Sequence, residues 1–155
     1  VIVWGRNQKA LLRYEKEMSM YEYQITTTTN MSDIVEHCQL IVTCTPSERS
    51  LINAVRPGTH ITAIGSDTVS KRELSSDVML QADMNVTDSK DQSRIRGEIY
   101  QVLKDGNSLD GITELGQIIS GKIEGRVSQE HITIADLTGV AVQDIQISKA
   151  VLKNL

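Results

Sequence analysis

Several features are scarce or absent in this sequence of 155 residues. Phenylalanine is absent and aromatic residues make up only 3% of the chain, so we expect a core of Ile, Val, Leu and Met side chains. Two cysteines, Cys38 and Cys44, are too few for a disulfide framework. No export signal is recognisable, and the cysteines are interpreted as reduced thiols of a cytoplasmic protein.

The chain also lacks long apolar runs and an excess of positive charge. Its apolar runs have the length of strands, which predicts that no helix spans a membrane. The net charge is −4, from 16 Lys and Arg against 20 Asp and Glu. This mild acidity argues against binding to nucleic acids, because phosphate neutralisation needs a basic surface. His37, His60 and His131 share no metal-ligand spacing, so no metal site is expected.

Strand-like and helix-like segments alternate along a chain whose length fits one domain. Apolar or β-branched runs predict strands at 1–4, 23–27, 40–44, 60–64, 80–87 and 131–137. Helices are predicted at 8–18, 32–38 with Ser32 as N-cap, 89–103, 112–119 and 140–152. The continuous apolar run at 40–44 is typical of a strand covered on both faces. Together the segments predict an α/β fold with a parallel sheet and helices on both faces.

Four loops that follow predicted strands are rich in Gly, Ser, Thr or Asn. In parallel sheets, ligands bind in the loops beyond the carboxyl ends of the strands. Four such loops on one predicted edge indicate a site of nucleotide size. They are residues 5–7, 44–47, 65–68 and 138–139.

The segment Trp4-Gly5-Arg6-Asn7 has two interpretations. Either Gly5 opens a phosphate loop, or the segment ends the second strand of a dinucleotide fold. Asn7 fits the first poorly, since it stands where a glycine lets the backbone approach the pyrophosphate. In the second, Arg6 without a neighbouring acid is typical of proteins that select NADP, whose 2′-phosphate an arginine accommodates. A solvated surface charge explains Arg6 equally well.

Asp67 follows the strand predicted at 60–64. A carboxyl group partly shielded there by a bound ring would have a raised pKa and would exchange protons with a substrate amine. An Asx turn, or an N-cap of a helix containing residues 71–74, explains Asp67 as well and is favoured by spacing alone.

The loop after the strand at 40–44 offers hydroxyl and backbone N–H groups to a cofactor ribose or phosphate. A turn that simply ends the strand at Pro46 is the other interpretation, and the residues alone favour it. Cys44 is not expected to be a nucleophile, because no His or cation stands beside it in the sequence.

Several motifs, taken together, resemble the ornithine cyclodeaminase/mu-crystallin family. The strongest are Ile41-Val42-Thr43-Cys44-Thr45-Pro46-Ser47, Arg56-Pro57-Gly58-Thr59-His60-Ile61, Ala63-Ile64-Gly65-Ser66-Asp67 and Asp136-Leu137-Thr138-Gly139-Val140-Ala141-Val142-Gln143-Asp144. Glu114-Leu115-Gly116 and Gly125-Arg126 lie between the last two. The resemblance covers residues 33–155.

The resemblance implies a Rossmann-like, doubly wound, mostly parallel sheet. It makes Val1–Trp4 the second strand, so the first strand and its Gly-rich loop are expected to be lacking here. Residues 1–155 would then be a partial NAD(P)-binding domain, with the substrate and dimerisation domain absent from this chain.

The resemblance also implies roles for individual residues. Asp67 matches the family's catalytic Asp, which exchanges protons with the substrate nitrogen. The loop at Trp4 resembles NADP-using members more than the cyclodeaminase proper, so NADP(H) is expected over NAD(H). The implied cofactor-binding residues are Gly5, Arg6, Asn7, Thr43, Cys44, Thr45, Pro46, Ser47, Ile64, Gly65, Thr138, Gly139 and Val140.

The implied function is that of an NAD(P)-dependent oxidoreductase or cyclodeaminase acting at the C–N bond of an amino acid or cyclic imine. The expected partners are a nicotinamide dinucleotide and a small amino-acid or imine substrate. The full-length protein is expected to be a homodimeric enzyme, and this segment alone to be inactive. The alternative is a non-catalytic, mu-crystallin-like protein that binds NADPH and small molecules. A third interpretation is a decayed or truncated gene product that retains only the fold.

Overall fold

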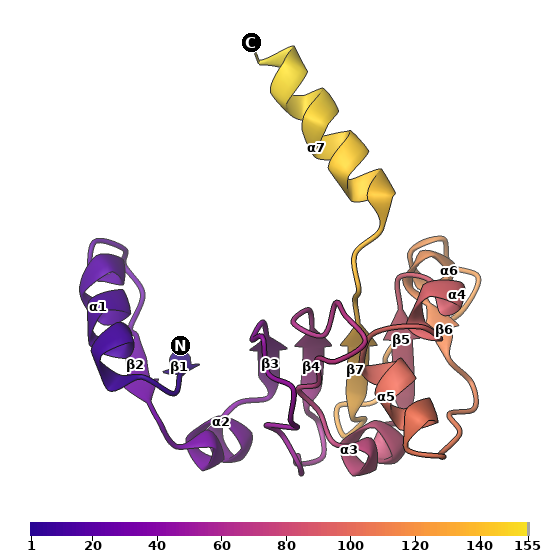
Figure 1. Ribbon diagram of the computed structural model, residues 1–155, viewed down its shortest axis with the longest axis horizontal. Helices are drawn as coiled ribbons and strands as arrows, with labels where there is room; N and C mark the ends of the chain where they lie inside the picture. The colour runs from indigo at the N-terminus through magenta and orange to yellow at the C-terminus, as the bar shows by residue number, and fades with distance from the viewer. Residues whose placement is uncertain (155) are drawn as a thin grey trace.

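Residues 1–154 are described by the structure, a computed structural model, in which two parallel sheets are joined through helix α2 (Figure 1). The smaller sheet pairs β1 (Ile2–Trp4) with β2 (Thr26–Thr28), and α1 (Gln8–Met18) connects these strands. Helix α2 (Met31–His37) then leads into the larger sheet. The predicted bounds of α1 are confirmed to the residue.

The larger sheet has five parallel strands in the order β3-β4-β7-β5-β6. Its strands are β3 (Leu40–Thr43), β4 (His60–Ala63), β5 (Met84–Thr87), β6 (Thr113–Glu114) and β7 (Thr133–Asp136). Its helices are α3 (Ser76–Gln81), α4 (Lys90–Ser93), α5 (Glu98–Lys104) and α6 (Leu115–Ile119). The predicted α/β fold with a mostly parallel sheet is confirmed.

The core lies around the larger sheet and contains the expected aliphatic side chains. Ile61 and Ile134, from β4 and β7, are fully buried together with Ile99 of α5. All the residues of β7 are buried, as expected for a central strand covered on both faces. Trp4 packs against the edge of this core and is only partly buried.

Strand β3 differs from its prediction, because it is not covered on both faces. Leu40 and Val42 are 66% and 57% exposed. Both line an apolar groove of about 500 Å³ that also contains Ile2 and Trp4 of β1. β1 pairs only with β2 and β3 only with β4, so within residues 1–154 the edges of the two sheets that border this groove lack a partner strand.

The helix predictions at 32–38, 89–103 and 112–119 are wrong in their boundaries, and the last begins only at Leu115 because residues 113–114 form β6. The N-cap of α2 is Asn30, whose side chain accepts a hydrogen bond from the Ser32 N–H. The strand expected within 80–87 is β5, at residues 84–87, and residues 80–81 belong to α3. The helix predicted at 89–103 is split into α4 and α5 at Gly97, which has φ +95°. A Cβ at Gly97 would lie 2.6 Å from a carboxylate oxygen of Asp136, so long-range packing interrupts the helix.

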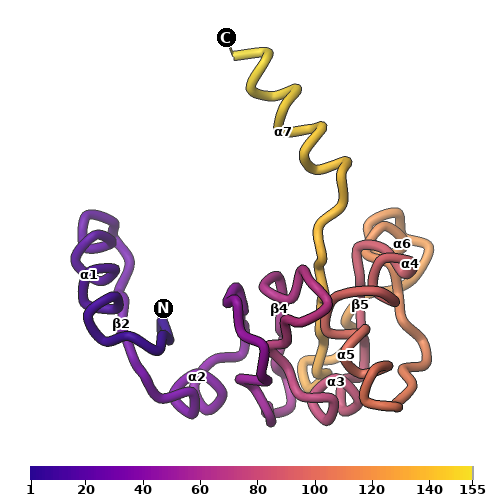
Figure 2. Tube along the Cα trace, in the orientation of Figure 1, coloured from indigo at the N-terminus to yellow at the C-terminus, as the bar shows by residue number. Residues whose placement is uncertain are grey.

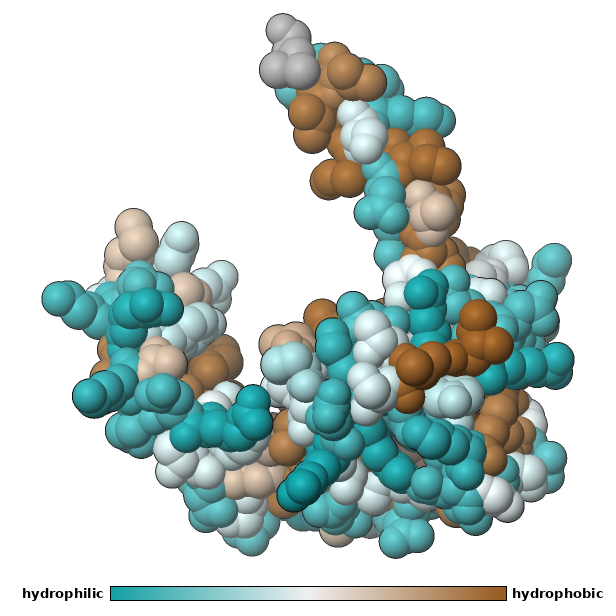
Figure 3. Space-filling model, in the orientation of Figure 1, coloured by the Kyte–Doolittle hydropathy of each residue, from teal (hydrophilic) through white to brown (hydrophobic). Residues whose placement is uncertain are grey.

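Helix α7 (Ala141–Lys153) follows β7 and runs away from both sheets (Figure 2). Its residues are exposed, and apolar side chains are visible along it in Figure 3. Within the described residues 1–154, none of the helices has both the length and the apolar character needed to cross a membrane.

Candidate functional site

Three of the four predicted loops lie along one edge of the larger sheet. Thr43 of β3 is in register with Ala63 of β4, and Ala63 is in register with Asp136 of β7. Because these parallel strands end at the same level, the loops at 44–47, 65–68 and 138–139 emerge side by side (Figure 1). The fourth loop, at 5–7, follows β1 in the smaller sheet.

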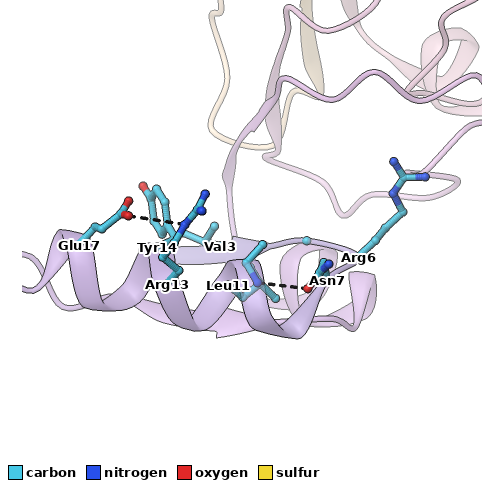
Figure 4. A pocket seen from close by; sticks show the side chains of 9 residues that line it. Val3, Arg6, Asn7, Leu11, Arg13, Tyr14 and Glu17 are labelled. Carbon is cyan, nitrogen blue, oxygen red and sulfur yellow. Dashed lines mark hydrogen bonds and ion pairs between the residues drawn. The ribbon is translucent and has the colours of Figure 1, made fainter.

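The loop at 5–7 begins α1 and borders a shallow pocket of about 420 Å³ (Figure 4). The Asn7 side chain caps the helix by accepting hydrogen bonds from the N–H groups of Lys9 and Ala10, at 2.9 and 3.2 Å. Gly5 donates its N–H to the Thr28 carbonyl at 3.1 Å, which ties the end of β1 to β2. Asn7 is therefore engaged in helix capping.

The Arg6 side chain points away from the pocket residues of α1 in Figure 4. It is exposed and forms no ion pair or side-chain hydrogen bond with another residue in the part of the chain that the structure describes. Arg13, also in this pocket, instead pairs with Glu17 at 3.5 Å. Of these two arginines, only Arg6 leaves its guanidinium uncommitted.

The loop after β3 uses its backbone donors within the protein. The Thr45 N–H donates to Oε1 of Glu73 at 2.6 Å, and the Ser47 N–H donates to the Thr45 hydroxyl at 3.3 Å. The Ser47 hydroxyl donates to the Arg49 carbonyl at 2.7 Å. These two N–H groups are thus not free for a phosphate, which fits the turn that the residues alone favoured. What the loop presents outward is the exposed Cys44 and Pro46.

Asp67 lies in the loop after β4, with its side chain 53% exposed. Lys71 Nζ donates to its Oδ1 at 2.6 Å. This hydrogen bond from Lys71 lowers the pKa of Asp67 in the protein without a ligand, and the raised pKa expected beside a bound ring stays a prediction. Residues 71–74 are not helical, so Asp67 is not an N-cap either. The structure makes Asp67 an exposed, ionised carboxylate at neutral pH.

The loop after β7 is held by two residues that sequence reasoning missed. Asp88 Oδ2 accepts the Gly139 N–H at 2.7 Å, and Gln92 Nε2 donates to the Thr138 hydroxyl at 2.6 Å. Gly139 has φ +83°, a conformation that glycine adopts readily. Val140 then occupies the N-cap position of α7.

Three buried carboxyl groups beneath this edge were also missed: Glu73, Glu98 and Asp136. Burial raises the pKa of Glu98 to about 8 and that of Asp136 to about 6. The nearby Asp136 and Glu73 raise the pKa of Glu98 further, while hydrogen bonds from the Glu73 and Leu74 N–H groups oppose the rise. Local sequence offers no signal for these residues, because each accepts a hydrogen bond from a residue 25 or more positions away along the chain.

Two curated relatives match most of this chain. An uncharacterized cyclodeaminase of Sinorhizobium fredii is 35% identical over 151 residues, which are 94% of this chain and 46% of that protein. The alanine dehydrogenase of Archaeoglobus fulgidus is 36% identical over 134 residues, which are 84% of this chain and 41% of that protein.

Solved structures of related enzymes share the fold. The iminosuccinate reductase of Paracoccus denitrificans in complex with NAD+ aligns with a TM-score of 0.89 and 30% identity, over 99% of this chain and 48% of that chain. An archaeal alanine dehydrogenase dimer with bound NAD has a TM-score of 0.88 and 32% identity, over 100% of this chain and 50% of that chain. The Δ1-pyrroline-2-carboxylate reductase of Thermococcus litoralis, in complex with NADH and L-proline, has a TM-score of 0.83 and 26% identity. The alignment covers 92% of this chain and 46% of that chain.

The chain spans about half the length of the relatives that it matches. The profile of the ornithine cyclodeaminase/mu-crystallin family matches residues 1–155, so the match extends beyond the segment that carried the resemblance. The neighbours by fold are Rossmann-type dehydrogenases and reductases. The chain therefore belongs to the ornithine cyclodeaminase/mu-crystallin family.

Proposed function

We propose that this chain is the nicotinamide-dinucleotide-binding part of an oxidoreductase or cyclodeaminase that acts at the C–N bond of an amino acid or cyclic imine. The alignment of three loops at one sheet edge, with Asp67 exposed among them, carries this proposal. Relatives named alanine dehydrogenase, iminosuccinate reductase and pyrroline-carboxylate reductase support the reaction class.

The surface of these loops fits a dinucleotide. Ile64 is 46% exposed at the end of β4, which leaves an apolar face for a flat ring. Cys44, Pro46 and Gly139 are exposed on the neighbouring loops. We propose that these residues hold the nicotinamide and its ribose, with Thr43, Gly65, Thr138 and Val140 shaping the surface beneath. When bound, the nicotinamide ring supplies a hydride acceptor or donor for the carbon that bears the substrate nitrogen.

Asp67 would manage the proton of the reaction. When an amine becomes an imine, the nitrogen loses a proton as the carbon loses a hydride, and the ionised Asp67 accepts that proton. In the reductive direction Asp67 returns it to the nitrogen. Lys71 keeps the carboxylate ionised before substrate binds, because its ammonium group donates a hydrogen bond to Oδ1.

Arg6 supports a preference for NADP(H) over NAD(H). Its guanidinium is exposed and unpaired within residues 1–154, and no acid follows β1 to bind a ribose 2′-hydroxyl. The three solved neighbours were described with NAD or NADH, so this preference would distinguish the present protein from them.

The apolar groove between the two sheets has the features of a position for one more parallel strand. β1 and β3 each face it with an unpaired edge, and its lining of Ile2, Trp4, Leu40 and Val42 is apolar. We propose that a strand outside residues 1–155 pairs with both edges and ends in the Gly-rich phosphate loop. The substrate and dimerisation domain would also lie outside this chain, and a dimer is supported by the archaeal alanine dehydrogenase dimer.

Turnover by the full-length protein tests the proposal. Reduced nicotinamide is followed by absorbance with a cyclic imino acid, a 2-oxo acid plus ammonia, or ornithine as substrate. In Asp67→Asn we expect kcat to fall about 10³-fold, the size of a lost acid–base catalyst, while cofactor Kd changes less than about threefold because the amide keeps the side chain's shape. Near-normal turnover of this variant would remove Asp67 from the mechanism.

Asp105 provides a matched control, because it is another partly exposed Asp paired with a cation, Arg72, at 2.7 Å. Asp105→Asn should leave kcat unchanged. Cofactor binding by the wild-type protein without turnover of any substrate would favour the non-catalytic, mu-crystallin-like alternative. Binding of neither nicotinamide dinucleotide would contradict both functions.

A further inference from the structure

Glu73 joins two of the site loops through one side chain. It is fully buried, and its two carboxylate oxygens accept hydrogen bonds from different loops. Oε1 accepts the Thr45 N–H at 2.6 Å, after β3, and Oε2 accepts the Gly65 N–H at 3.0 Å, after β4. Gly65 lies so close to Glu73 and to the Thr45 carbonyl that a Cβ atom there would clash with both.

The backbone of Glu73 is itself held on both sides. Its N–H donates to Oε1 of Glu98 at 2.7 Å, and its carbonyl accepts the N–H groups of Leu51 and Ile52 at 2.7 and 3.1 Å. Glu98 lies at the start of α5, where Asp136 Oδ2 accepts the Ile99 N–H at 2.9 Å. A chain of carboxyl groups thus runs from the end of β7 to the loops after β3 and β4.

Burying the Glu73 carboxyl group in the core destabilises the folded protein. No Lys or Arg pairs with Glu73 within the described residues. A buried carboxyl group without a cation costs free energy that apolar packing would avoid. The two N–H groups that Glu73 satisfies, however, lie at the positions that set the distance between Thr45 and the Asp67 loop.

We propose that Glu73 is a positioning residue, which fixes the cofactor loop at Thr45 relative to the loop that carries Asp67. The inference rests on the proposed function and adds a residue that touches neither substrate nor cofactor. A misplacement of about 1 Å between reacting groups costs about 100-fold in rate, so this clamp controls the chemical step more than binding.

Glu73→Gln in the full-length protein tests the clamp. The amide nitrogen cannot accept a hydrogen bond, so one of the two loops is released. At saturating cofactor and substrate we expect kcat to fall about 10- to 100-fold, while substrate KM and cofactor Kd change less than about threefold. Hydrogen exchange at the Thr45 or Gly65 amide should accelerate about tenfold, the effect of losing one buried hydrogen bond.

Val78→Ala is the control for simple destabilisation. Val78 is fully buried in α3, which Figure 1 places at the opposite end of the strands from the site loops. This variant should lower Tm and leave both kcat and the relative exchange of Thr45 and Gly65 unchanged. A Glu73→Gln protein with kcat within twofold of wild type, or with unchanged exchange at both amides, would overturn the proposal.

Turnover and amide hydrogen exchange test the reaction and the loop clamp separately. A wild-type protein without turnover contradicts the proposed reaction and, with it, a positioning role for Glu73. Exchange measured on that same protein still reports whether the two loops are clamped. A loss of kcat in Glu73→Gln that Val78→Ala reproduces at equal Tm would reduce Glu73 to a structural residue.

Discussion

The two sheets of this protein hold their strand-end loops in different ways. After β3, β4 and β7 the loops are held by side chains outside the loops themselves, including the buried Glu73 and the half-buried Asp88. After β1 the loop is held by the Asn7 cap of α1 and by a backbone bond from Gly5 to Thr28 of β2, and within residues 1–154 it accepts no side-chain hydrogen bond from outside the loop. Arg6 projects from this second loop without a protein partner in residues 1–154.

This difference matches the task proposed for each loop. Groups that take part in proton and hydride transfer need fixed distances, because rate depends steeply on geometry. A side chain that attracts a terminal phosphate needs charge and reach rather than a fixed position. We therefore expect changes in the loops of the larger sheet to alter stability and rate, and changes in the loop after β1 to alter mainly cofactor affinity.

The largest expected effect concerns the buried carboxyl group of Glu98. Its pKa is about 8 in the folded protein against 4.5 ordinarily. Between these pH values the unfolded chain releases the proton and the folded protein keeps it, so the free energy of unfolding falls as pH rises. The loss from Glu98 should be on the order of 4 kcal/mol and complete above about pH 8.

Denaturant titrations of wild type and Glu98→Gln at several pH values check this. The amide does not ionise, so the variant should lack most of the decline, although Asp136, with a pKa of about 6, keeps some of it at lower pH. Glu130→Gln, at an exposed position, should follow wild type. Parallel curves for wild type and Glu98→Gln would show that Glu98 ionises normally in the folded protein.

Two glycines, one in each region, are expected to differ in how much an alanine substitution lowers the free energy of unfolding. A Cβ at Gly65 would clash with Glu73 and with the Thr45 backbone, whereas at Gly5 its nearest neighbour would be Cδ2 of Leu11, at 3.0 Å. Gly65→Ala should cost about 3 kcal/mol of unfolding free energy and Gly5→Ala less than about 1 kcal/mol. Urea denaturation measures both, and equal costs would contradict the distinction between the two regions.

The smallest expected effect is on cofactor selection by Arg6. In the full-length protein Arg6→Ala should weaken NADPH binding about tenfold, the loss of one charge-assisted hydrogen bond, and change NADH binding less than about twofold. Calorimetric titration measures both. Arg13→Ala is the control, because Arg13 already pairs with Glu17. A wild-type preference for NADH, or an unchanged NADPH affinity in Arg6→Ala, would make Arg6 a plain surface charge.

Much of the fold could be predicted because its signals are local. The bounds of α1 follow from its helical pattern and the strand positions from short apolar runs. Predicted helix boundaries were wrong where residues distant in the sequence pack against the helix. At Gly97, which has a positive φ, the neighbouring side chain is Asp136, 39 positions further along the chain. The ion pair between Asp67 and Lys71, which lowers the pKa of Asp67, could not be predicted either, because it depends on where the Lys71 side chain is directed.

The sequence by itself determined the alternation of strands and helices, the aliphatic core, the positions of the strand-end loops and the family motifs. These depend on residue periodicity and composition, which are readable along the chain. Only the tertiary structure decided which loops share an edge and what holds them. Thr45 and Glu73 are 28 positions apart, and Glu73 and Glu98 are 25 apart. Hydrogen bonds over such separations form only after the strands assemble, so no local pattern specifies them.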